Sequence, residues 1–231
     1  MTSDLAHTAS SRAPARRAQL LLAVEFAAVF GVLPVVVWIL RSRGVRLPII
    51  PMIVGIGLLA WIHLRNRPDF DRRAVWHLPR TRAVWVAMGI RFALAAVLLT
   101  AIAVWFGPDE VLSFPRRRPG TWAIVMLGYP LLSVLPQEIV YRAFVFHRYR
   151  PLFGTGLGIV TASALAFGHV HIVFGHWQSL LLSTLGGLLF GATWRRTGSL
   201  TVVWIEHAAY GCFVFTIGLG RWFYGGAALP A

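Results

Sequence analysis

A few ionisable side chains interrupt otherwise apolar runs of this sequence. Glu138 and Arg142 fall in the run 120–148, and His207 falls in the run 198–219. If these runs cross a membrane, each such group costs on the order of 2–3 kcal/mol even on insertion scales, which makes it a functional candidate by default. A carboxylate can take a proton from water held in a dry cavity, and a His can donate to an oxyanion or leaving amine. These residue types predict hydrolysis of a peptide bond.

Glu138 and Arg142 are spaced to form a pair. They are four residues apart with the carboxylate N-terminal to the cation, which puts them on one helical face in the favourable order. Arg142 is therefore expected to position Glu138. Pro136 is expected to start or kink this helix, so that Gln137 and Glu138 lie in its first turn, where free backbone N–H groups favour a carboxylate.

Histidines in two other runs can reach the same depth. At a rise of about 1.5 Å per residue, Glu138 and His207 lie at similar distances from loops on one membrane face. His171 lies somewhat beyond the midplane, a difference that helix tilt can close. His169 points about 200° away from His171 around the helix, so only one of the two can face Glu138. A carboxylate and two His on three helices indicate a reactive site, and such a set can also hold a metal ion.

The composition places these residues in a membrane protein. Hydrophobic residues make up 57% of the 231 and charged residues 13%, and the mean hydropathy is +0.68, which excludes a soluble globular protein. The basic residues are all Arg and give a net charge of +14. They lie in short clusters between apolar runs rather than on polar helices or in tails, so no nucleic-acid partner is expected. Cys212 is the single cysteine, which rules out an intramolecular disulfide.

Seven apolar runs are long enough to approach the roughly 20 residues that a spanning helix needs. They are 18–40, 47–64, 83–106, 120–148, 155–174, 177–194 and 198–219. The first is longer than the apolar region of a secretory signal, so it is expected to be a retained anchor. The predicted fold class is all-α, a polytopic transmembrane helical bundle of about seven spans, with membrane lipid as a partner.

The distribution of Arg predicts the orientation. With the N-terminus in the cytoplasm, more Arg lie on the inner side than on the outer side, as the positive-inside rule requires. The segment 65–82 carries several of them and is expected to be an interfacial stretch at the cytoplasmic face. The predicted location is the bacterial inner membrane, with a cytoplasmic N-terminus.

Three stretches resemble the motifs E-E-x-x-x-R, F-x-x-x-H and H-x-x-x-N of the CAAX prenyl endopeptidase and bacteriocin-processing (CPBP) family of intramembrane proteases. They read Gln137-Glu138-Ile139-Val140-Tyr141-Arg142, Phe167-Gly168-His169-Val170-His171 and His207-Ala208-Ala209-Tyr210-Gly211. The resemblance covers about 120–215 and leaves the first three runs without a motif. It implies a helical bundle whose site opens within the membrane, and it selects His171 over His169.

Two positions depart from the family motifs. Gln137 replaces the first Glu and cannot act as a base, so the water-activating role passes to Glu138. Gly211 replaces the final Asn and removes a side-chain donor for the oxyanion, which Gln137 or Tyr210 is expected to supply instead.

The leading hypothesis is an intramembrane endopeptidase that hydrolyses peptide bonds of membrane-associated protein or peptide substrates. Glu138 activates water, and His171 and His207 orient it and donate to the tetrahedral intermediate. The family has been described both as glutamate-based and as metal-dependent. The same three residues, Glu138, His171 and His207, are therefore the candidate ligands of a Zn²⁺ ion.

Two other functions compete with this hypothesis. One is a catalytically impaired relative that acts as a membrane scaffold or bacteriocin-immunity-type protein, for which Gln137 and Gly211 are the arguments. The other is a proton-coupled transporter that uses Glu138, His171 and Glu25 as a relay. An inverted repeat of the runs would favour the transporter, and the sequence has no such repeat.

The expected domain organisation has four parts. They are a disordered tail over 1–17, transmembrane helices over 18–119 that include the interfacial segment 65–82, a CPBP-like catalytic core over 120–219, and a C-terminal tail over 220–231.

Overall fold

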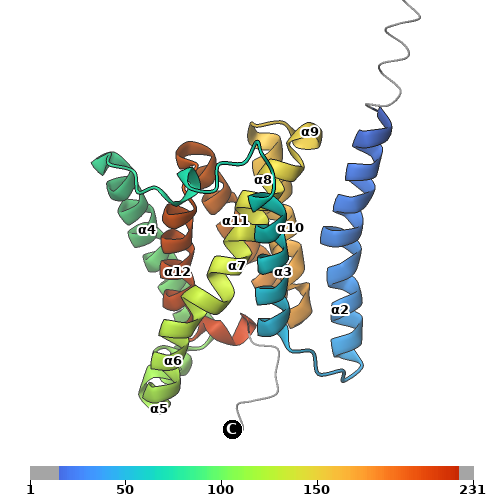
Figure 1. Ribbon diagram of the computed structural model, residues 1–231. Helices are drawn as coiled ribbons and strands as arrows, with labels where there is room; N and C mark the ends of the chain where they lie inside the picture. The colour runs from blue at the N-terminus through green and yellow to red at the C-terminus, as the bar shows by residue number, and fades with distance from the viewer. Residues whose placement is uncertain (1–15, 224–231) are drawn as a thin grey trace, which may run out of the picture.

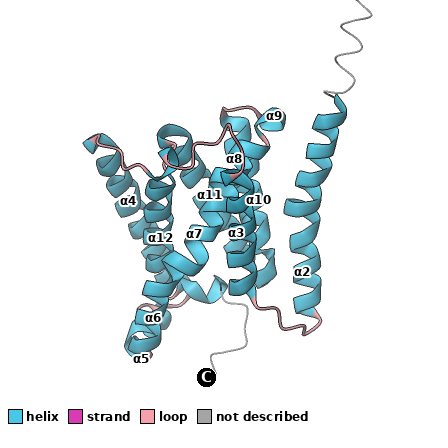
Figure 2. Cartoon of the chain, in the orientation of Figure 1, coloured by secondary structure: helices cyan, strands magenta, loops and turns pink. Residues whose placement is uncertain are grey.

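The computed structural model describes residues 16–223 of the chain. Within this range every regular element is a helix, and loops and turns make up the rest (Figure 2). This confirms the predicted all-α bundle. Most of the predicted N-terminal tail and residues 224–231 of the predicted C-terminal tail lie outside the described residues.

Helices occupy all seven predicted positions (Figure 1). The first helix, Arg16–Ser42, contains η1 (Ala27–Val32) and α2 (Leu33–Ser42). It is followed by α3 (Ile49–Arg65), η2 (Ala74–Trp76), α4 (Arg82–Phe106), η3 (Pro108–Glu110) and α5 (Ser113–Arg117). A long helix, Pro119–Arg148, then runs through α6 (Pro119–Tyr129), η4 (Pro130–Val134), α7 (Leu135–Glu138), η5 (Ile139–Phe144) and α8 (Val145–Arg148). The chain ends with α9 (Arg150–Phe153), α10 (Leu157–Val170), η6 (His171–Phe174), α11 (Trp177–Thr197), α12 (Leu200–Thr216) and η7 (Leu219–Phe223).

The helices that can span a bilayer are fewer than the predicted seven. In the described part of the chain, four helices are long and apolar enough by length and composition: Arg16–Ser42, Arg82–Phe106, Pro119–Arg148 and Leu157–Phe174. The apolar helices α3 and α12 have only 17 residues each, and α11, at 21 residues, is not among the four. The chain is an integral membrane protein, and seven is the number of helices at the predicted positions rather than the number that pass this test.

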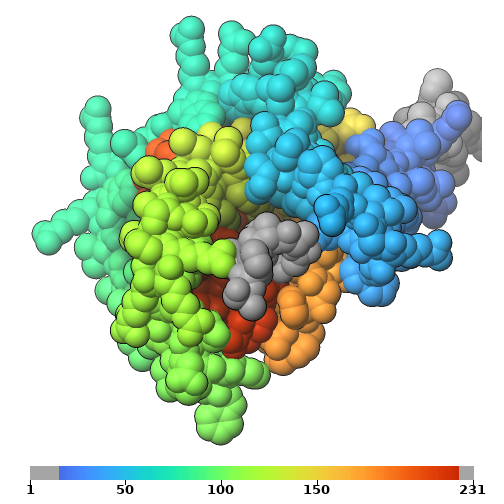
Figure 3. All heavy atoms as spheres, turned by 90° about the horizontal axis from the view of Figure 1, so that it is seen from below, coloured from blue at the N-terminus to red at the C-terminus, as the bar shows by residue number. Residues whose placement is uncertain are grey.

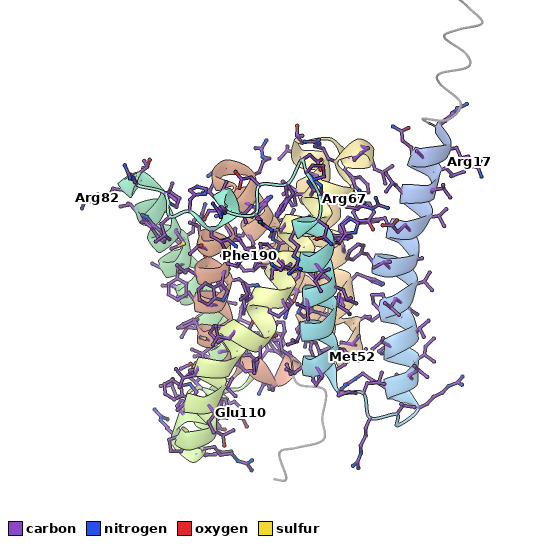
Figure 4. The ribbon with its side chains drawn as sticks, viewed as in Figure 1. Arg17, Met52, Arg67, Arg82, Glu110 and Phe190 are labelled. Carbon is purple, nitrogen blue, oxygen red and sulfur yellow. The ribbon has the colours of Figure 1, made fainter. Side chains whose placement is uncertain are left out.

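Neighbouring helices run in opposite directions, which groups the loops at two ends of the bundle. Arg17, Arg67 and Arg82 lie at one end, and Met52 and Glu110 lie at the other (Figure 4). Helices at seven successive apolar runs must alternate in direction in this way if each run crosses the membrane. Loops that the sequence assigned to one membrane face therefore do share one end.

The predicted interfacial segment closes the Arg-rich end over the start of α12. Val75 is buried against Leu200 and Val203. The hydroxyls of Ser199 and Thr201 donate to the backbone carbonyls of His77 and Trp76. Asp71 accepts the backbone N–H groups of Arg73 and Ala74, and these bonds lower the pKa of its exposed carboxyl. These contacts fix the position of α12 and of the His207 that it carries.

The long helix Pro119–Arg148 is continuous, yet it widens into π turns at η4 and η5 on either side of α7. The prediction that Pro136 starts this helix is wrong, because Val134 and Leu135 already have helical backbone angles. A proline gives no N–H to the carbonyl four residues back, and wider turns accommodate that loss. Glu138 therefore lies inside a helix, and side chains rather than free N–H groups must stabilise its charge.

Close contact between α10 and α11 depends on small residues. A Cβ on Gly187 would lie 2.9 Å from Cα and 3.1 Å from the carbonyl oxygen of Ala164. Neither of those backbone atoms can move without shifting a helix. In membranes such small residues let backbones approach and gain van der Waals contact. This contact holds Phe167 of α10 against Phe190 of α11.

Gly187→Ala should destabilise the fold by about 1–3 kcal/mol, because the added methyl overpacks the contact between α10 and α11. The matched control is Gly89→Ala in α4, where a Cβ meets nothing within 4 Å. That change should leave stability unchanged or raise it by about 0.5–1 kcal/mol through helix propensity. Unfolding of purified protein in mixed micelles measures both. Equal stability of the two variants would contradict the close-packing argument.

Candidate active site

The Glu138 carboxylate is fully enclosed, with no exposed surface. Its Oε1 accepts a hydrogen bond of 2.7 Å from Nδ1 of His207. Its Oε2 lies 3.1 Å from Nε of Arg142, which confirms the predicted i,i+4 pair. The N–H of Arg142 does not point along that line, so Oε2 has no hydrogen-bond donor among the described residues. One carboxylate oxygen is therefore bound to an imidazole, and the other can still accept.

Arg142 is held by contacts that its charge requires. It is fully buried, and its Nη1 donates to the Ser163 hydroxyl at 2.8 Å. Ser163 in turn donates to the backbone carbonyl of Tyr141 at 2.6 Å. The guanidinium also lies over the rings of Phe167 and Phe190, 5.2 and 5.8 Å from their centroids. Hydrogen bonds and cation–π contacts thus compensate part of the desolvation of the cation.

His207 links the carboxylate to a tyrosine that the sequence analysis missed. Since a carboxylate only accepts, Nδ1 of His207 carries the hydrogen and Nε2 of the neutral ring is an acceptor. The Tyr129 hydroxyl lies 3.3 Å from this Nε2 and is therefore the donor. The His207 ring stacks on Phe190 with centroids 4.6 Å apart and planes at 18°. Phe190 lies about midway between the two ends of the bundle in Figure 4, which places the hydrogen-bonded pair of Glu138 and His207 near the middle of the bundle.

The π turn at η4 explains why Tyr129 escaped prediction. Tyr129 and Glu138 are nine residues apart, which in a regular α-helix puts them roughly 180° apart. A π turn takes one residue more than an α turn, so it brings both side chains toward the same side. Tyr129 precedes Pro130, where the π turn begins. That proline is the only sequence signal, and it does not by itself specify a π turn.

His171 and His169 have the different orientations that their spacing predicts. Nε2 of His169 is bonded to the carbonyl of Gly31 in the first helix. Nδ1 of His171 donates to the carbonyl of Phe167 at 2.7 Å, which leaves Nε2 as the acceptor of the neutral ring. The Phe167 ring lies against both imidazoles, with centroids 4.9 Å from His171 and 5.3 Å from His207. Phe223, within the predicted C-terminal tail, packs against His171 from η7.

A cavity of about 1250 Å³ joins these side chains. Polar residues of the site line one part of its wall, namely Tyr129, Ser133, Gln137, His171, His207 and Tyr210. The rest is mostly apolar and comes mainly from the first helix, α3 and α11, which also contribute Arg41, His63 and Ser183. Figure 3 views the end opposite the Arg-rich loops, where the 119–148 helix (yellow-green) and the N-terminal part of the described chain (blue) lie on opposite sides of the bundle. Several wall residues, among them Leu59 and Ile124, are mostly exposed on the outer surface, so the cavity opens toward lipid.

The two residues expected to replace the motif's missing donor are placed differently. Gln137 lines the cavity but donates its amide to the Ser133 hydroxyl at 2.7 Å. The Tyr210 hydroxyl is buried without a hydrogen-bond partner in the described chain, and its ring packs on Phe190 and Phe92. A Cβ on Gly211 would collide with the ring and hydroxyl of Tyr129. The space that a side chain would fill at 211 is therefore taken by Tyr129.

Two other carboxylates within apolar helices have partners of their own. Glu206 accepts a hydrogen bond of 2.7 Å from Arg91. Glu25 binds Arg148 through both oxygens and also accepts from the Tyr149 hydroxyl. The proposed transporter relay required Glu25 to work with Glu138 and His171. Its observed partners instead tie the first helix to the end of the 119–148 helix.

The donors expected to bind zinc do not converge. Across residues 16–223, no three His, Cys, Asp or Glu side chains lie close enough together to hold a metal ion. Glu138 and His207 touch, and Nδ1 of His171 donates to the Phe167 carbonyl, which leaves Nε2 of that ring as its acceptor. As they lie in this structure, Glu138, His171 and His207 are not grouped closely enough to hold one Zn²⁺ ion.

Comparison with known proteins supports the family resemblance. Residues 119–213 match the family model described as type II CAAX prenyl endopeptidase Rce1-like. The matched segment contains Glu138, His171 and His207, and the match confirms the resemblance that the three motifs carry. Searches of the curated proteins and of the solved structures gave no significant match.

The Glu138–Arg142 pair predicts strong coupling in stability. Glu138→Gln or Arg142→Met alone leaves one buried charge unmatched and should cost about 3–5 kcal/mol. The double variant leaves neither charge and should cost less than the sum of the two single changes. A double-mutant cycle of unfolding free energies in micelles measures the coupling. Additive effects would show that the pair is not an energetic unit.

Proposed function

We propose that this chain, which contains an Rce1-like core over residues 119–213, is an intramembrane endopeptidase acting on membrane-associated protein substrates. The family match supports a CAAX-type intramembrane protease. The observation that carries the finer proposal is the hydrogen bond between Glu138 and His207 at the wall of a lipid-open cavity. A carboxylate that orients an imidazole is a general way to make a base.

In this mechanism Glu138 activates water through His207. The carboxylate has no exposed surface, whereas His207 lines the cavity and its Nε2 can accept a proton. Water attacks the peptide carbonyl carbon as its proton moves to Nε2, and the carbonyl electron pair becomes the oxyanion. Glu138 stabilises the resulting imidazolium through Nδ1. When the C–N bond breaks, the imidazolium returns the proton to the leaving amine.

The neighbouring side chains position these groups. Nε2 of His171 is an acceptor on the wall of the same cavity and orients the attacking water through its second hydrogen. Arg142 keeps the Glu138 carboxylate in place from the side away from His207. The gap between the imidazoles is filled by Phe167, which excludes bulk water from the space behind them.

The cavity indicates the class of substrate. Most of its polar residues lie near the Glu138–His207 pair, and the remaining wall is largely apolar and open toward lipid. An extended segment with apolar or lipid-modified side chains fits this wall and presents one backbone carbonyl to the polar region. Extended backbone is required because the peptide carbonyl of a helix is already hydrogen-bonded and shielded.

The Arg-rich end of the bundle faces the cytoplasm in this proposal. The end that holds Arg17, Arg67 and Arg82 also holds the loops at 149–156 and 198–199, and the opposite end has fewer Arg. Under the positive-inside rule this gives a cytoplasmic N-terminus in a bacterial inner membrane. The segment over the start of α12 then lies at the cytoplasmic interface.

Cleavage of membrane-embedded reporter peptides tests the activity. Wild type should cleave, and Glu138→Gln should lower kcat by about 10²–10⁴-fold, as expected for loss of general acid–base catalysis. The matched control is Glu206→Gln, which neutralises an equally buried carboxylate that pairs with Arg91 instead of His207. This control should retain activity when the rate of each variant is expressed per amount of folded protein. Equal loss in both variants would contradict the assignment of Glu138.

The same assay separates the protease from an impaired relative and tests for zinc. A chelator should leave cleavage unchanged if no metal participates, and loss that only added Zn²⁺ restores would support a metal bound after rearrangement of His171. Gln137→Glu restores the second carboxylate of the family motif. If wild type cleaves nothing and Gln137→Glu does cleave, the chain is a catalytically impaired relative.

Thiol labelling in intact cells tests the orientation. In a Cys212→Ser background, Arg43→Cys lies between α2 and α3, at the end that holds Met52, and Arg72→Cys lies between Arg67 and Arg82, at the Arg-rich end. A membrane-impermeant maleimide should label residue 43 from outside and residue 72 only after the cells are opened. The reverse pattern would invert the proposed topology.

A further inference from the structure

Tyr129 occupies a position that the mechanism above does not use. It lines the cavity, and its hydroxyl is 3.3 Å from Nε2 of His207, the atom that receives the proton from water. It comes from the 119–148 helix, whereas His207 comes from α12. The fold thus places a neutral hydroxyl beside the reacting atoms from a separate element.

We propose that Tyr129 is a catalytic residue whose hydroxyl donates a hydrogen bond to the oxyanion of the tetrahedral intermediate. This inference rests on the proposed endopeptidase function. It adds the donor that the chemistry needs, because the negative charge that develops on the carbonyl oxygen must be met in a cavity with little water.

The hydrogen bond in the resting site makes Tyr129 responsive to the reaction. Before attack, Nε2 of His207 accepts from the hydroxyl over a long distance, so the bond is weak and costs little to break. Once Nε2 has taken the proton from water it can no longer accept. The Tyr129 hydrogen is then released to the oxyanion, which forms at the same moment.

Two packing contacts fix the phenol in this position. Gly211, one turn after His207 on α12, leaves the space in which the Tyr129 ring and hydroxyl lie. The ring of Phe215, one turn further on, contacts Tyr129 edge-on with centroids 5.2 Å apart. A hydroxyl held by packing rather than by water is preorganised for the oxyanion.

The alternative donors around the cavity are less suited. The Gln137 amide donates to Ser133, and the Tyr210 hydroxyl is itself buried. Arg142 has no exposed surface and lies behind Glu138. Tyr129 has a hydroxyl hydrogen that can rotate about the C–O bond, it lies on the cavity wall, and it contacts His207, the proposed base.

Steady-state cleavage by Tyr129→Phe tests the proposal. The variant keeps the ring and its packing, and kcat should fall by about 10²-fold with KM within about threefold of wild type, as for loss of an oxyanion donor. The matched control is Tyr149→Phe, which removes a hydroxyl bonded to Glu25 outside the site. It should keep wild-type kcat. The Tyr210→Phe variant tests whether the Tyr210 hydroxyl, rather than that of Tyr129, donates to the oxyanion.

A side-chain exchange tests the role of Gly211 independently. Gly211→Asn alone should lose activity because its side chain collides with Tyr129, and Tyr129→Ala alone should lose activity with its donor. Together, Tyr129→Ala and Gly211→Asn put an amide N–H donor into the vacated space. The double variant should exceed each single variant by about tenfold or more in kcat.

The outcomes distinguish this inference from the function on which it rests. If wild type cleaves no reporter, the proposed function fails and the inference falls with it. If wild type cleaves and Tyr129→Phe matches its kcat, or if only Tyr210→Phe loses activity, the function stands and Tyr129 is not the donor. A double variant no more active than the weaker single variant would overturn the role of Gly211.

Discussion

The burial of the Glu138 carboxylate is the constraint on which the rest of this structure depends. A charge with no exposed surface in an apolar bundle requires compensating partners, and Arg142 and His207 supply them from opposite sides. Their positions then fix four segments relative to one another, namely the 119–148 helix, α10, α11 and α12. Arg142 needs Ser163 on α10, and His207 needs the stacked Phe190 on α11. One buried carboxylate therefore determines how the helices of the core pack.

Polar interactions and close packing have separate tasks in this core. The small residues of α10 and α11 let the two backbones approach, so the rings of Phe167 and Phe190 pack closely between them. These rings in turn place apolar surface against the imidazoles of the site and the guanidinium of Arg142. In such surroundings each hydrogen bond is stronger than in water, and each unpaired polar atom is more costly. This explains why the site is built from short links between buried groups.

The sequence predicted the parts of the site that follow from spacing within regular helices. The Glu138–Arg142 pair and the opposite orientations of His169 and His171 depend on the angle per residue, and the structure confirms them. The direct contact of Glu138 with His207 follows from equal depth in neighbouring helices. The predictions that failed concern positions where the backbone departs from regular α-helical geometry. Pro136 does not start a helix, and Tyr129 faces His207 because the π turn at η4 lies between Tyr129 and Glu138. Such turns depend on tertiary packing and leave no residue pattern that identifies them.

The π turns also govern how this chain can change length. A single π turn holds one residue more than the α turn that it replaces, so deleting one residue within 130–134 can restore a regular helix without breaking it. The deletion would leave the parts of the helix on either side of the turn in nearly the same relative orientation, because it removes the one residue that the wider turn absorbs. The same deletion in a regular α-helix would rotate one part by about 100° relative to the other. The stretch 130–134 is therefore a place where the chain can lose one residue while the Tyr129 hydroxyl stays on the side of the buried charges.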